Sequence, residues 1–81
     1  MDINQIIEQG NQYRADNQPE AALQCYAEAM RQDRKNAAAF NNYGNVLREV
    51  GEPEGAIPFL TRAIQLDSKN ITAQFNLAVA H

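Results

Sequence analysis

The residue types that most often carry catalysis are scarce in this chain. His81 is the only histidine and occupies the last position, where a frayed end does not orient a general base. Cys25 is the only cysteine and has no histidine near it in sequence, so we interpret it as a packing residue rather than a nucleophile. No phosphate loop, zinc-ligand spacing or nucleophile elbow is present. We therefore expect no enzymatic activity, no metal site and no cofactor.

Composition and charge narrow the classes of partner. The chain has 81 residues, of which 44% are hydrophobic and 21% charged, which is ordinary for a globular protein. A formal charge of −3 gives no attraction to phosphate backbones or anionic membranes, and no apolar run approaches the ~20 residues of a membrane span. We therefore expect no nucleic acid and no membrane partner. The polar, acidic N-terminus and the single cysteine indicate a cytoplasmic location.

The elements that must position any functional side chains repeat along the chain. A shift of 34 residues aligns residues 3–36 with residues 37–70 and gives ten identical pairs. Among them are Gly10 with Gly44 and Pro19 with Pro53. Residues 71–81 continue the same period for half a unit. A fixed period of this length is the signature of a repeat architecture, so we expect one domain over residues 1–81.

Helix-end signals recur with the same period. Asp2, Asn36 and Asn70 each precede a helix-favouring run and can accept hydrogen bonds from its free N–H groups. The predicted first helices of the units are residues 3–15, 37–49 and 71–81. Pro19 and Pro53 suit the first turn of a helix, and the predicted second helices are residues 19–32 and 53–66.

Small residues and one proline carry further expectations about packing. Gly10 lies opposite Ala22 in the predicted first pair, and Gly44 opposite Ala56 in the second, so each pair is expected to approach closely through a contact of small residues. Pro58 falls inside the predicted helix 53–66, where it removes a backbone hydrogen bond and predicts a local bend.

The repeated unit resembles the tetratricopeptide repeat over nearly the whole chain. The matching residues are Ile6, Gln9, Gly10, Tyr13, Ala22 and Tyr26 in the first unit and Phe40, Tyr43, Gly44, Leu47, Ala56 and Leu60 in the second. The resemblance implies an all-α fold, with antiparallel helix-turn-helix units stacked in a right-handed superhelix, an α-solenoid of about two and a half units.

In this family the first helices of successive units form a concave wall that commonly holds an extended peptide or a partner's helix. The residues that the resemblance places on this wall, and that we expect to contact a peptide, are Asn11, Arg14, Asn41, Asn42, Asn45, Arg48 and Asn76. Asparagine amides pair with any peptide backbone, and the arginines favour a partly acidic ligand. These residues predict a protein-interaction scaffold. An alternative is that asparagine is simply common at these positions of the family for helix packing and solubility.

Two binding modes of the family can be compared with these residues. Asn42 and Asn76 match an asparagine ladder seen in the repeats of O-linked N-acetylglucosamine transferases, which these units resemble, although Glu8 interrupts it in the first unit. The rival mode is a clamp of cations and asparagines that holds the C-terminal tail of chaperones. Ile7, Thr72 and Asn76 stand where that clamp needs cations, so we do not expect a chaperone tail as the partner.

The last half unit is apolar and ends without the polar capping helix that solenoids normally have. Its sequence indicates either a piece of a longer array or a structural module that forms homo-oligomers through this helix. The residues expected at such an interface are Ile71, Phe75, Ala78 and Val79.

Overall fold

The computed structural model describes residues 1–80 and contains five α-helices in this range. They are α1 (Ile3–Ala15), α2 (Pro19–Gln32), α3 (Ala37–Glu49), α4 (Pro53–Leu66) and α5 (Ile71–Ala80). The predicted helix ranges and the all-α class are confirmed. His81 lies outside the described residues. The end of the predicted helix 71–81, with its expected fraying at this residue, is therefore not tested.

The predicted caps hold the first helices of the units. An Asp2 carboxylate oxygen accepts from the Gln5 backbone N–H at 2.8 Å, and the side chain of Asn36 accepts from the Ala39 N–H at 3.1 Å. Asn70 caps α5 in the same way through Ala73 at 2.9 Å. At the other ends of α1 and α3, Asn17 and Gly51 adopt positive φ angles of 61° and 89°, as expected for residues that reverse the chain after a helix.

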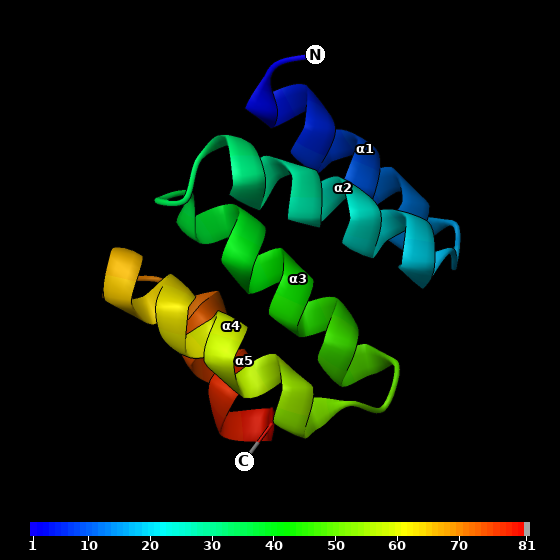
Figure 1. Cartoon of the computed structure of the whole chain (residues 1–81). Helices are drawn as coiled ribbons and strands as arrows, with labels where there is room; N and C mark the ends of the chain where they lie inside the picture. The colour runs from blue at the N-terminus through cyan, green and yellow to red at the C-terminus, as the bar shows by residue number, and fades with distance from the viewer. Residues whose placement is uncertain (81) are drawn as a thin grey trace.

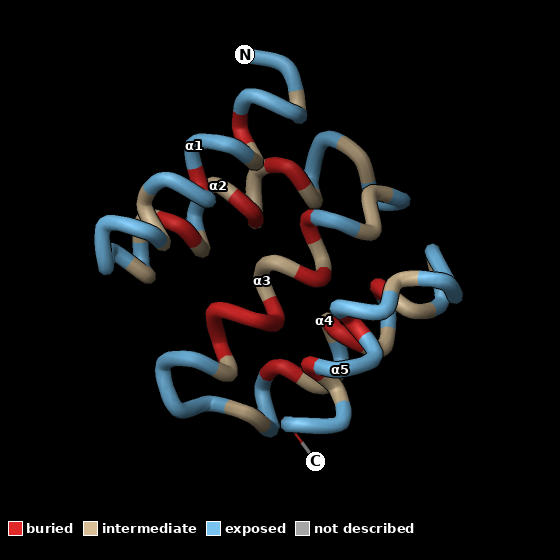
Figure 2. Tube along the Cα trace, turned by 180° about the vertical axis from the view of Figure 1, so that it is seen from behind, coloured by how far each residue is buried: buried red, intermediate tan, exposed pale blue. Residues whose placement is uncertain are grey.

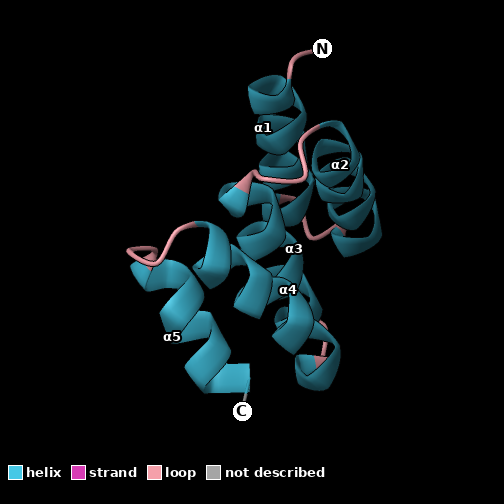
Figure 3. Cartoon of the chain, turned by 60° about the vertical axis from the view of Figure 1, so that its left-hand side comes forward, coloured by secondary structure: helices cyan, strands magenta, loops and turns pink. Residues whose placement is uncertain are grey.

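The helices are stacked in chain order (Figure 1). α1 packs against α2 and α3 against α4, so each unit is a helical hairpin, and α2 packs against α3 to join the two units. α5 packs against α4 and α3 and forms one edge of the stack (Figure 3). This arrangement is a solenoid of about two and a half helix pairs.

The buried residues concentrate on α3, which has neighbours on both sides (Figure 2). The largest fully buried side chains are Tyr26, Leu60 and Val46. Between units, part of the contact is made by small residues: Ala29 of α2 and Ala39 of α3 are fully buried in one cluster with Ile6. Small side chains at this junction let successive hairpins approach closely.

Within each hairpin, the side chain nearest to the helical glycine is large rather than small. A methyl group placed on Gly10 would lie 2.6 Å from Tyr26 Cε1, and one placed on Gly44 would lie 2.7 Å from Leu60 Cγ. The atoms nearest to a methyl group on Gly10 belong to Tyr26 and Cys25, not to the predicted Ala22. A methyl group on Gly44 would also lie 3.3 Å from the Ala56 carbonyl oxygen, so the predicted contact with Ala56 is present there beside Leu60. The second helix of each unit inserts a large side chain, one turn beyond the alanine, into the space that the glycine leaves open.

Pro58 lies inside α4, which continues through it, and its ring is exposed to solvent. The hydrogen bond that it removes is the one to the Glu54 carbonyl, and Glu54 is exposed as well. Water can replace the missing donor on this side of the helix. The predicted bend stays a prediction.

We predict opposite effects for two alanine substitutions at helical glycines. Gly44→Ala should destabilise the chain by about 1–3 kcal/mol, because its methyl group overlaps Leu60. Gly55→Ala is the control, since its methyl group would have no neighbour closer than 3.9 Å, and it should stabilise the chain by about 0.5 kcal/mol. Urea denaturation followed by circular dichroism measures both, and a Gly44→Ala variant as stable as wild type would contradict this packing.

Candidate functional site

The residues predicted for peptide contact all lie on the first helices of the units, α1, α3 and α5. We call the surface that they form the asparagine face, and its members are Asn11, Arg14, Asn41, Asn42, Asn45, Arg48 and Asn76. The structure divides them by exposure. Asn41 and Asn45 are each 7% exposed and Asn76 is 3% exposed, whereas Asn11 is exposed and Asn42 is half-buried.

A first group of hydrogen bonds involves α1. Asn11 Oδ1 accepts from the Tyr26 hydroxyl at 2.5 Å and from Asn42 Nδ2 at 3.4 Å. Burial raises the pKa of Tyr26, which keeps its hydroxyl protonated as a donor. Two donors occupy the oxygen of Asn11, while its amide N–H groups donate no hydrogen bond within residues 1–80 and remain available. Asn11 therefore presents a fixed hydrogen-bond donor on the surface.

A second group of hydrogen bonds joins α3 to α5. Asn76 Nδ2 donates to Asn41 Oδ1 at 3.2 Å, and Asn41 Nδ2 lies 3.5 Å from Asn42 Oδ1. Arg48 Nη2 donates to Asn45 Oδ1 at 2.6 Å and lies 3.5 Å from Asn76 Oδ1. Asn41 and Asn76 are thus paired with each other and Asn45 with Arg48, as groups removed from water must be. Their hydrogen-bonding capacity serves mainly to join helices.

Arg14 binds Glu49 of α3 in a bidentate ion pair. Its Nε and Nη2 atoms lie 2.8 Å and 2.5 Å from the two carboxylate oxygens. The hydrogen bonds from Arg14 lower the pKa of Glu49, so the carboxylate remains charged at neutral pH. The charge of Arg14 is therefore compensated within the protein, whereas Arg48 forms no ion pair within residues 1–80.

Sequence reasoning missed two members of this network, Glu49 and the hydroxyl of Tyr26. Glu49 lies 35 residues after Arg14, one repeat plus one residue, and this spacing is a usable signal for an ion pair between adjacent units. Tyr26 corresponds to Leu60 in the second unit, so the repeat alignment indicates only a large apolar residue there. Leu60 has no hydroxyl, so the alignment does not indicate a role for the hydroxyl of Tyr26.

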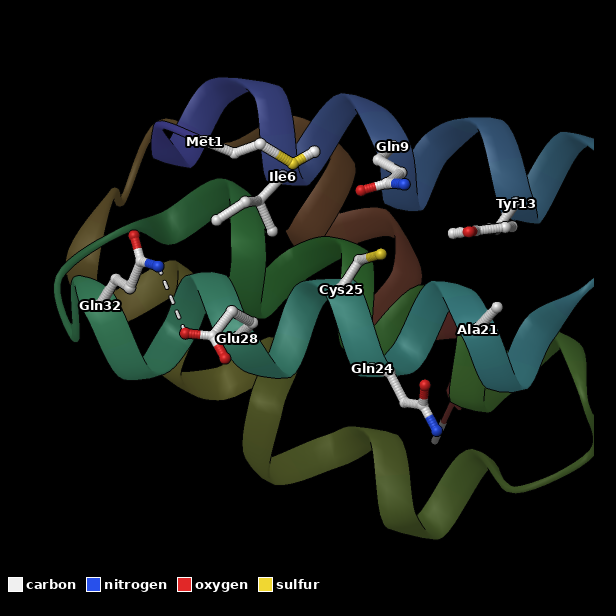
Figure 4. A pocket seen from close by; sticks show the side chains of 9 residues that line it. All are labelled: Met1, Ile6, Gln9, Tyr13, Ala21, Gln24, Cys25, Glu28 and Gln32. Atoms are coloured by element: carbon white, nitrogen blue, oxygen red, sulfur yellow. Dashed lines mark hydrogen bonds between the residues drawn. The ribbon is translucent and has the colours of Figure 1, made fainter.

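A separate groove of about 430 Å³ lies between α1 and α2 and contains Cys25 (Figure 4). Burial raises the pKa of the Cys25 thiol, which disfavours the reactive thiolate. On the rim, Gln32 Nε2 donates to Glu28 Oε2 at 3.3 Å. Over residues 1–80, His, Cys, Asp and Glu side chains form no cluster of three or more with the geometry to hold a metal ion.

The residues predicted for an oligomer interface form an exposed apolar row on α5. Ile71, Phe75 and Val79 are 78%, 63% and 50% exposed, and Ala78 is exposed as well. Phe75 and Val79 correspond by the repeat to Asn41 and Asn45 of α3, which are buried. The exposed row is thus the equivalent of a surface that is covered one unit earlier. Within residues 1–80, no helix has the length and apolarity to span a membrane.

Comparison with known proteins supports the repeat assignment. A family model described as TPR repeat matches residues 10–51, and a second described as tetratricopeptide repeat matches residues 37–70. No curated protein has a significantly similar sequence.

Two solved structures have the same fold. The second TPR of Spaghetti (RPAP3), bound to the HSP90 peptide SRMEEVD, superposes with a TM-score of 0.93 at 24% identity and covers 96% of this chain and 72% of its own. The first TPR of the same protein, bound to the same peptide, gives a TM-score of 0.92 at 20% identity, with 96% and 63% covered. At these identities the likeness establishes the fold alone.

Proposed function

Because the chain belongs to the tetratricopeptide repeat family, we propose that it is a non-catalytic protein-interaction module that holds an extended peptide along the asparagine face. In this family that face corresponds to the concave wall. Fold does not fix function, so the proposal rests on the residues of the face. The observation that carries it is the orientation of Asn11, whose carbonyl oxygen is held from inside by Tyr26 and Asn42.

Asn11 and Asn42 are the amides on this face that a ligand can reach. A peptide carbonyl can accept from the available N–H groups of Asn11 without any rearrangement of the protein, since the amide is already oriented. Arg48 adds a positive charge on the adjacent turns of α3 and favours an acidic group in the peptide. Asn41, Asn45 and Asn76 support this surface from below.

The same residues argue against a carboxylate clamp of the kind that holds chaperone tails. Ile7 and Thr72 supply no cation at two of the positions concerned. Asn76, at the third, is buried and hydrogen-bonded to Asn41. Because Asn76 is buried, Asn42 is the one member of the transferase-like asparagine ladder that a ligand can reach. We therefore propose that the ligand is bound through its backbone rather than through its C-terminal carboxylate.

We predict that peptides selected on the wild-type chain from a random peptide array lose affinity when Asn11 and Asn42 are both replaced by alanine. Loss of two backbone contacts should raise Kd by about tenfold or more in titration calorimetry. Gln65→Ala, an exposed amide on α4, is the matched control and should bind as wild type does. The peptide SRMEEVD should bind no better than a scrambled version.

Equal affinities for wild type and the double variant would overturn the role of these amides. Tight binding of SRMEEVD that depends on its free carboxylate would instead indicate a chaperone-tail site.

A second proposed function, self-association, is favoured by the exposed row on α5. A second copy of the chain is a suitable occupant because α5 carries no charged residue, so two copies of the helix can pack together without like-charge repulsion. Burial of Ile71, Phe75 and Val79 supplies the driving force.

We predict that light scattering shows a mass that increases with protein concentration for wild type and stays monomeric for Phe75→Glu. Gln65→Glu introduces the same charge away from α5 and should associate as wild type does. A wild-type chain that remains monomeric at millimolar concentration would rule out self-association through α5.

A further inference from the structure

A groove with an unusual combination of side chains lies between α2 and α4, on the second helices of the two units. Its volume is about 410 Å³, and its lining residues are Ala27, Met30, Arg31, Arg34, Phe40, Phe59 and Arg62. The lining contains no acidic residue and three of the five arginines of the chain. A net charge of −3 makes this local excess of positive charge distinctive.

The three arginines leave most of their charge available to a ligand. Arg34 and Arg62 are exposed and form no ion pair with any residue of the range 1–80. Arg31 pairs with Glu28, but its side chain is 72% exposed. Guanidinium groups bind carboxylates in a planar, bidentate geometry, which makes exposed arginines around a groove suitable for acidic side chains.

The apolar part of the groove is built around two aromatic rings. The rings of Phe40 and Phe59 stack with their centroids 6.5 Å apart, and Tyr43 supports Phe59 at a centroid distance of 4.5 Å. Phe40, Phe59 and Met30 are each only partly buried. Their accessible surface can receive one large apolar side chain, and burial of that side chain would add to the attraction between charges.

The repeat provides an internal comparison that separates this feature from packing. The equivalent groove in front of the first unit is the one that contains Cys25 (Figure 4), where Ile6, Cys25 and Glu28 take the places of Phe40, Phe59 and Arg62. An acidic residue thus replaces a basic one at the same structural position. Because both units form the same helical hairpin, packing within a hairpin does not require the aromatic and basic set of the second unit.

We propose that the groove between α2 and α4 is a second ligand site, which binds an acidic peptide segment through one large apolar side chain flanked by carboxylates. The apolar side chain packs on Phe40 and Phe59. The carboxylates pair with Arg34 and Arg62, and with Arg31 at the edge. None of the groove's lining residues belongs to the asparagine face, so the two proposed sites use different side chains.

The test uses the complete chain and a short fluorescein-labelled peptide in which a Phe-Leu pair is flanked on both sides by glutamates. Fluorescence anisotropy measures its Kd for wild type and for the Arg34→Gln/Arg62→Gln variant. Lys35→Gln/Lys69→Gln is the matched control, because it removes the same two charges from the turns between units, outside the groove. A second peptide with Ser-Ser in place of Phe-Leu tests the apolar contact.

The arginine variant should raise Kd by about tenfold or more, and the lysine variant by less than about twofold. The Ser-Ser peptide should bind wild type at least about tenfold more weakly than the Phe-Leu peptide does. Four results would overturn the proposal: no binding to wild type, equal losses in both charge variants, equal binding of the two peptides, or equally effective competition by a single-stranded oligonucleotide. The last would indicate nonspecific attraction of polyanions.

Discussion

The first helices α3 and α5 are joined by a buried amide hydrogen bond between Asn41 and Asn76, and the form of the asparagine face depends on it. Asn41 and Asn76 lie in the contact between α3 and α5, where an unpaired amide would cost about 1–3 kcal/mol, and Asn45 is buried one turn further along α3. Each is paired with another asparagine or with Arg48. Such a contact fixes the position of α5 relative to α3 more narrowly than apolar side chains would, because hydrogen bonds are directional. It also determines which amides remain for a ligand.

A different kind of contact forms each hairpin. Tyr26 and Leu60 fill the space beside Gly10 and Gly44, and Tyr26 then supplies the hydroxyl that orients Asn11. One side chain therefore links the packing of a hairpin to the chemistry of its outer surface. The two surfaces proposed for ligands also differ in chemistry. The asparagine face offers amides to a peptide backbone, whereas the groove between α2 and α4 offers arginines and aromatic rings to side chains.

Local features of the fold could be predicted from the sequence, while contacts between helices could not. Caps such as Asn36 and the turn at Gly51 depend on a few neighbouring residues, and the repeat showed each of them twice. The partner of Gly44 depends on how far α4 is shifted along α3, which no local pattern encodes. The division of the asparagines into buried and accessible members arises for the same reason, since Asn41 and Asn42 are adjacent in sequence and differ only in which helix they face. The apolar character of α5 indicated an interface, and Phe75 is exposed on it.

A double-mutant cycle on Asn41 and Asn76 tests most directly whether buried amides hold the first helices together. The free energy of unfolding is measured for wild type, Asn41→Ala, Asn76→Ala and the double variant. Each single variant should lose about 1–3 kcal/mol, and the double variant should lose less than the sum by about 0.5 kcal/mol or more, because the second substitution removes an amide that has already lost its partner. Strictly additive losses, or single variants as stable as wild type, would contradict this account.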